Sequence, residues 1–127
     1  MTEATRLAAS AKVLVICDPH DRESGEVVVR QLNELGYATK LVLTPGEALW
    51  HLEDSDHTFH AVVIDGDRAL ADRFELLSHL RERHPAMIRL LLLTSPSTLE
   101  FEDCEVVDKQ GQREALSSAL ARFIGPS

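Results

Sequence analysis

The chain has 127 residues, of which 44% are hydrophobic, and this is enough apolar material for one independently folding domain. Its formal net charge of −8 argues against binding nucleic acid, since phosphate contacts require clustered Lys and Arg. No apolar run approaches the length of a membrane span and the first 11 residues lack the apolar region of a signal peptide, so we expect a cytoplasmic protein with no membrane contact.

Short apolar runs alternate along the chain with segments that have helical spacing. The spacing of apolar residues predicts helices around 28–35, 48–52, 70–77 and 116–123. Gly36 and Pro85 follow two of these helices, as helix-ending residues do. The runs between the helices are almost free of polar alternation, which is typical of strands covered on both faces. They predict five strands, at Lys12–Cys17, Ala38–Leu43, Ala61–Asp65, Ile88–Leu93 and Glu105–Val107.

This alternation predicts an α/β fold with a doubly wound, five-stranded parallel sheet between two layers of helices. Parallel strands joined by helices need right-handed crossover connections, and short connections keep neighbours in sequence close in space. We expect the domain to span residues 12–124. Residues 1–11 are predicted to form a flexible N-terminal tail, and residues 125–127 a C-terminal tail or the start of a linker.

Four polar residues follow the ends of predicted strands, and these are the candidate site residues. Asp65 ends the run Ala61–Asp65, while Asp18, Thr94 and Lys109 each follow another run. The carboxyl ends of parallel strands lie at one edge of the sheet, where open α/β sheets bind their ligands. The sequence therefore predicts one polar pocket that contains all four side chains.

Each of these residues taken alone also has a purely structural interpretation. An aspartate after a strand commonly caps a helix or forms a turn, and for Asp18 alone this interpretation is favoured. Thr94 alone fits a capping residue at a strand end, and Lys109 alone fits a solvated surface lysine. Asp65 has a stronger functional case, because Asp67 follows closely and two neighbouring carboxylates repel each other without a cation. Their joint placement favours a functional site.

The motifs resemble those of response-regulator receiver domains (CheY-like), whose fold is the flavodoxin-like three-layer sandwich. The stretch Ala61–Asp65, followed by Phe74–Leu77, is similar to the phosphorylation strand and third helix of that family. Thr44–Leu49 resembles the start of the family's second helix, and Leu92–Ser95 resembles its fourth strand. The resemblance covers roughly Lys12 to Ile124, which is nearly the whole chain.

The resemblance implies that Asp65 accepts a phosphoryl group from a histidine kinase or a phosphotransfer protein of a two-component system. It also implies a Mg²⁺ ion, because a phosphoryl group approaching a carboxylate among other acids is strongly repelled. Asp18, Asp65 and the backbone carbonyl of Asp67 match the ligands of this ion. Lys109 would contact the phosphoryl oxygens, and Thr94 would donate a hydroxyl hydrogen bond to the phosphorylated form.

Several positions depart from the family pattern. Cys17 replaces the first of two consecutive acids, which predicts weakened Mg²⁺ binding, and a buried apolar role for this thiol is expected. Gln110 replaces the proline after the lysine, and Val106 replaces an aromatic or histidine that responds to phosphorylation in the family. The segment between Thr94 and Lys109 is short, which predicts a shortened fourth helix. Apolar surface exposed there, near Leu99, Phe101 and Val106, would allow homodimerisation or contact with an effector domain.

Two alternatives from other classes remain open. One is a pseudo-receiver that has the same fold but acts as a constitutive protein-interaction or dimerisation module. The other is a haloacid-dehalogenase-like phosphatase, because Asp65-Gly66-Asp67 loosely resembles its Asp-x-Asp nucleophile motif. Such enzymes carry further acidic ligands after the lysine, whereas only 18 residues follow Lys109 here. We therefore expect a signalling domain without enzymatic turnover.

Overall fold

The computed structural model describes residues 11–53, 59–65, 70–93 and 104–124, with the backbone alone for 70–74 and 122–124. Strands and helices alternate as predicted. In chain order the elements are β1 (Lys12–Ile16), a short 3-10 helix η1 (Pro19–Asp21), α2 (Arg22–Glu34), β2 (Ala38–Val42), α3 (Pro45–Glu53), β3 (Ala61–Asp65), α4 (Leu70–Arg83), β4 (Ile88–Leu93), β5 (Glu105–Asp108) and α5 (Gln112–Ile124). The shortened helix expected after Thr94 falls outside the described residues.

All five strands are parallel, in the order β2-β1-β3-β4-β5. This is the strand order of flavodoxin-like sheets. The chain adds β2 on one side of β1 and then β3, β4 and β5 on the other side, so the order of the strands reverses between β1 and β3. The register pairs Ile16 of β1 with Ile64 of β3, and Asp65 with Leu92 of β4. Asp65 therefore lies at the carboxyl edge of the sheet, on the central strand.

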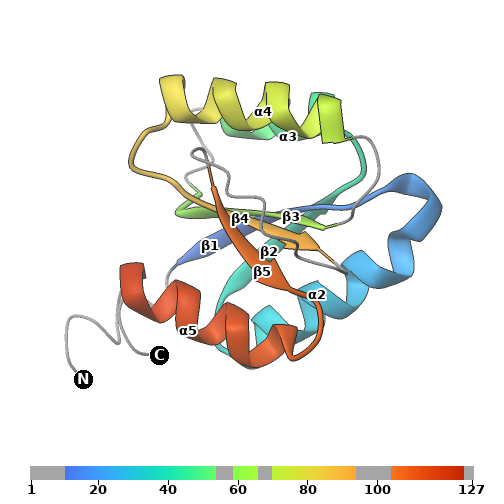
Figure 1. The fold of residues 1–127 in the computed structure, drawn as a ribbon, viewed down its shortest axis with the longest axis vertical. Coiled ribbons are helices and arrows are strands. Elements are labelled where there is room, and N and C mark those ends of the chain that lie inside the picture. Colours follow the sequence, from blue (N-terminus) through green and yellow to red (C-terminus); the bar gives the residue numbers. More distant parts are fainter. Residues whose placement is uncertain (1–10, 54–58, 66–69, 94–103, 125–127) are drawn as a thin grey trace.

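Helices cover both faces of the sheet, as Figure 1 shows, with α3 and α4 on one face and α2 and α5 on the other. Each face has its own hydrophobic core, because successive side chains of a strand point to opposite faces. Val13 and Val15 of β1 pack with α2 and α5, whereas Leu14 and Ile16 pack with α3 and α4. The predicted three-layer α/β sandwich is confirmed.

Local sequence signals explain two of the helix ends. Thr44 Oγ1 accepts a hydrogen bond of 3.1 Å from the backbone N–H of Glu47, and Pro45 occupies the first position of α3. At the end of α2 the backbone N–H of Tyr37 donates to Leu32 O, and that of Gly36 donates to Asn33 O, both at 3.0 Å. This pair of bonds is a Schellman motif. Gly36 adopts the left-handed φ of 98° that the motif requires.

Replacing Gly36 by alanine is expected to lower the free energy of unfolding by about 1 kcal/mol, because a Cβ strains a left-handed residue. Urea unfolding followed by circular dichroism measures this difference. Gly46→Ala is the matched control: the added Cβ would lie 3.9 Å from Thr44 Oγ1, an ordinary contact. Since alanine favours helix, the control should be neutral or stabilising by about 0.5 kcal/mol. Equal effects at both positions would contradict the role of the φ angle.

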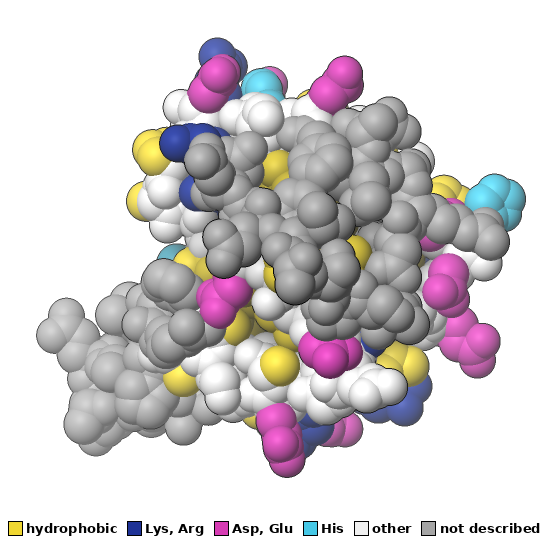
Figure 2. Space-filling view, viewed as in Figure 1, with side chains coloured by type: hydrophobic (Ala, Val, Ile, Leu, Met, Phe, Trp, Pro, Cys, Tyr) yellow, Lys and Arg dark blue, Asp and Glu magenta, His cyan; other side chains and the backbone are white. Residues whose placement is uncertain are grey.

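The described part of the face in Figure 2 carries its acidic side chains in a dispersed pattern. These side chains are spread over both helical layers and do not gather in one patch. Among the described residues, Trp50 of α3 is a large hydrophobic side chain left 66% exposed. None of the described helices has the length and apolar character needed to cross a membrane.

Candidate functional site

The candidate site is centred on Asp65, a buried acid at the end of the central strand. Its side chain is only 2% exposed, and the four residues before it in β3 are fully buried apolar residues. Alternation along β3 assigns Asp65 to the face that α2 and α5 cover, since Ala61 and Val63 pack there. A buried carboxylate requires a charged partner or several hydrogen bonds.

Lys109 supplies the charge that Asp65 requires. Its Nζ lies 2.8 Å from Asp65 Oδ1, and the lysine side chain is 19% exposed. Within the described part of the chain, Asp65 Oδ1 is buried and has no hydrogen-bond partner of good geometry, so this short contact acts as an ion pair. The structure thus brings together two of the predicted site residues that are 44 positions apart in sequence.

Lys109 reaches this position from the end of the edge strand β5. Its backbone N–H donates to Leu93 O at 3.0 Å, which continues the ladder between β5 and β4. The chain then turns at Gln110, whose N–H donates to Asp108 Oδ1 at 2.9 Å, and at Gly111, which has a φ of 70°. The peptide between Lys109 and Gln110 is trans. Gln110, at the position where receiver domains usually carry a proline, therefore takes part in an Asx-type turn after the lysine.

Ser24 is a further contact of Lys109 that the sequence did not reveal. Its hydroxyl accepts a hydrogen bond of 3.1 Å from Lys109 Nζ, and the two residues are 85 positions apart. Ser24 belongs to the first turn of α2, where serine is common for reasons of helix capping alone. No sequence pattern distinguishes it from the other serines of the chain.

Cys17 lies beside Asp65 in the sheet but faces α2. It follows Ile16, as Asp65 follows Ile64, and those two residues are paired in the register. The Cys17 side chain is fully buried, and Gly25 of α2 packs directly over it. An ideal Cβ on Gly25 would lie 2.5 Å from Cys17 Sγ, a distance that real side chains do not tolerate. Cys17 thus occupies a tightly packed, fully buried position.

Asp18 acts as the cap of the helix η1. Its Oδ1 accepts a hydrogen bond of 2.8 Å from the backbone N–H of His20, and its side chain is half-buried. The capping role expected for Asp18 alone is therefore observed, and its role as a metal ligand stays a prediction. Asp21, a second acid in this loop, is exposed and makes no capping bond from its side chain.

The remaining predicted site residues, Asp67 and Thr94, lie outside the described residues, as do Leu99 and Phe101 of the expected interaction surface. Val106 is described: it is half-buried and packs against the core on the α3 and α4 face. Within the described ranges no three His, Cys, Asp or Glu side chains form a cluster that could hold a metal ion.

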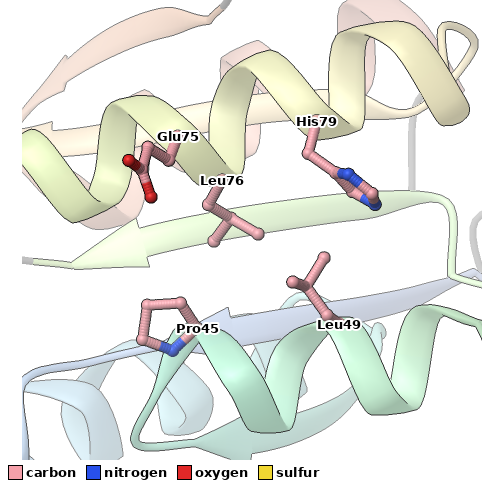
Figure 3. Close-up of a pocket in the computed structure, with 5 residues that line it drawn as sticks. All are labelled: Pro45, Leu49, Glu75, Leu76 and His79. Carbon is pink, nitrogen blue, oxygen red and sulfur yellow. The ribbon is translucent and has the colours of Figure 1, made fainter.

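A separate groove of about 320 Å³ lies between α3 and α4. Figure 3 shows Pro45 and Leu49 of α3 facing Glu75, Leu76 and His79 of α4 across it. His79 Nε2 lies 3.5 Å from Glu53 Oε1, which links the two helices beside the groove. The groove is lined by a mixture of apolar and charged groups, and the Asp65–Lys109 pair does not line it.

No protein-family model matches the sequence, and no curated protein matches it. Solved structures do resemble its fold. The chemotaxis response regulator CheY4 of Vibrio cholerae is 21% identical with a TM-score of 0.72, and the match covers 90% of this chain and 98% of that one.

Two further similar structures are receiver domains. The receiver domain of a sensor histidine kinase from Pseudomonas aeruginosa PAO1, solved with a magnesium ion in its active-site cleft, is 20% identical with a TM-score of 0.73, covering 91% of this chain and 98% of that one. The signal receiver domain of an HD domain-containing protein from Pseudomonas fluorescens Pf-5 is 17% identical with a TM-score of 0.73, covering 91% and 94%. The chain therefore has the fold of response-regulator receiver domains, as its sequence motifs predict.

Proposed function

We propose that this chain is an atypical receiver domain of a two-component system, which accepts a phosphoryl group on Asp65. The observation that carries the proposal is the buried pair of Asp65 and Lys109, 2.8 Å apart at the carboxyl edge of the central strand. A carboxylate 2% exposed beside an ammonium is costly to build for stability alone. Buried charged groups of this kind are concentrated at functional sites.

In the proposed reaction a carboxylate oxygen of Asp65 attacks the phosphorus of a phosphohistidine on a partner kinase or phosphotransfer protein. The new P–O bond forms as the P–N bond breaks, and the imidazole leaves with the electron pair of that bond. Lys109 stabilises the charge on the phosphoryl oxygens, because its ammonium is already held beside the accepting carboxylate. The product is an acyl phosphate on Asp65.

The proposed transfer uses a divalent cation. The buried Oδ1 of Asp65, which lacks a well-directed hydrogen bond within the described residues, is a hard oxygen donor of the kind that Mg²⁺ selects. We propose that Asp65 and Asp18, with the backbone carbonyl of Asp67, would hold the ion. Mg²⁺ would neutralise charge on the transferring group. Cys17 contributes no carboxylate and faces Gly25, so we propose weaker Mg²⁺ affinity than in receivers with two acids after the first strand.

The test is intact-mass spectrometry after incubation with acetyl phosphate and Mg²⁺. The native chain is expected to gain the mass of one phosphoryl group, and Asp65→Asn is expected to gain none, because an amide oxygen is a far weaker nucleophile. Asp21→Asn, at an exposed acid, is the matched control and should label like the native chain. Beryllofluoride binding, measured with the native chain and the same two variants, detects an acceptor whose acyl phosphate hydrolyses too quickly to accumulate.

A pseudo-receiver is the second candidate function, and the packing of Cys17 favours it. The usual first acid is replaced by a fully buried thiol, which removes one carboxylate from the site. In this case the native chain would show neither a phosphoryl adduct nor beryllofluoride binding under conditions that label an ordinary receiver. The chain would then act through a partner, an effector domain or a second copy of itself. Steady release of phosphate from an ester would instead indicate a phosphatase.

A further inference from the structure

The start of α2 approaches the site more closely than an ordinary helix could. Gly25 has no side chain, and a Cβ there would lie 2.5 Å from Sγ and 2.7 Å from Cβ of Cys17. The helix backbone consequently rests on the end of β1. This close approach brings the residue before the glycine, Ser24, within hydrogen-bond distance of Lys109 at the end of β5.

Lys109 is therefore held from two sides. Its Nζ lies 2.8 Å from Asp65 Oδ1 and 3.1 Å from Ser24 Oγ, so a carboxylate of β3 and a hydroxyl of α2 share one ammonium group. A lysine side chain has four rotatable carbon–carbon bonds, and fixing it costs up to about 2 kcal/mol in rotamer entropy. A second acceptor that is itself anchored in a helix offsets part of this cost before any ligand arrives.

We propose that Ser24 is a positioning residue for Lys109. Its hydrogen bond raises the population of the Lys109 conformer in which the ammonium lies beside the accepting carboxylate. This inference rests on the proposed function, because the group that Lys109 serves is the phosphoryl group transferred to Asp65. Ser24 itself does not touch the reacting atoms. Its contribution is to keep Lys109 out of the solvent, on the side of Asp65 that α2 covers.

The kinetic test compares labelling rates by acetyl phosphate in the native chain, Ser24→Ala and Ser24→Thr. Ser24→Ala should slow labelling roughly tenfold, the loss expected for one hydrogen bond to a charged group. Ser24→Thr keeps the hydroxyl and should restore most of the rate. Ser118→Ala, at an exposed serine of α5, controls for the loss of a helical hydroxyl and should leave the rate unchanged. Equal rates in the native chain and Ser24→Ala would overturn the proposal.

A spectroscopic test reads the contact without any phosphorylation. In the native chain the Lys109 ammonium protons should exchange slowly enough with water to give a resolved nitrogen-correlated NMR signal, assigned by its loss in Lys109→Met. In Ser24→Ala that signal should broaden or vanish, and in Ser24→Thr it should return. If the native chain takes no phosphoryl group, the proposed function fails. Loss of the NMR signal in Ser24→Ala and its return in Ser24→Thr would still support a positioning role for Ser24. An ammonium signal unaffected by Ser24→Ala would overturn it.

Discussion

Replacing Lys109 by methionine is expected to lower the free energy of unfolding by about 3 kcal/mol, the usual cost of leaving one charge of a buried pair without its partner. Asp65 would keep its position at the end of β3, where its side chain is 2% exposed, but the ammonium 2.8 Å away would be gone. Methionine fills a similar volume, so the loss reports the charge more than the packing. Urea unfolding followed by circular dichroism, in the presence of a chelator, measures it.

A double-mutant cycle separates this effect from a general loss of stability. Asp65→Asn combined with Lys109→Met removes both charges, so the double variant should be more stable than Lys109→Met alone. Lys40→Met, at an exposed lysine of β2, is the matched control and should change stability by less than about 0.5 kcal/mol. Additive single effects in the cycle would show that Asp65 and Lys109 do not stabilise each other.

Cys17→Asp, which introduces the acid that receiver domains usually carry at this position, is expected to destabilise the chain by about 3 kcal/mol or more. The new carboxylate would be fully buried beneath Gly25, in a space where even a single added carbon on the glycine would clash. It would also stand beside Asp65 on the neighbouring strand, and two buried like charges at such a separation repel strongly. The single substitution should therefore fail to produce an ordinary receiver.

Unfolding of Cys17→Asp is best measured with a chelator and again with excess Mg²⁺. Cys17→Ala is the matched control, because it removes the sulfur without adding charge and should cost about 1 kcal/mol. Mg²⁺ should recover part of the stability of Cys17→Asp and none of that lost in Cys17→Ala, since only the former adds a ligand. A Cys17→Asp chain as stable as the native one without Mg²⁺ would mean that the carboxylate finds another position.

The elements of this fold were predictable because their signals are local. The strand Ala61–Asp65 is a continuous apolar run that ends in an acid, and the helix around Leu116 has apolar residues on one stripe. Parallel topology then carries Asp65 and Lys109 to the same edge of the sheet without further information. The sequence was therefore sufficient to predict that a carboxylate and an ammonium would meet there.

The parts that escaped prediction depend on how closely two elements approach. In the sequence, Ser24 and Gly25 have no feature that sets them apart from other residues at the start of a helix. Their contacts with Lys109 and Cys17 follow from the close packing of α2 on the end of β1. Asp18 illustrates the opposite case. Its capping bond to His20 is local and could be predicted, whereas its proposed role as a metal ligand depends on contacts between separate elements. Distances between side chains on different elements have no period in the sequence, so pattern analysis cannot supply them.

The exposed tryptophan of α3 determines which optical signals this molecule can give. Trp50 is the only tryptophan of the chain, and the residue is already 66% exposed to solvent. Its emission in the native state should resemble that of an unfolded chain, so intrinsic fluorescence will barely register denaturation. The same property makes the indole a sensitive native probe of anything that covers the outer side of α3, because a bound molecule would move it from water into a drier environment and shift its emission to the blue.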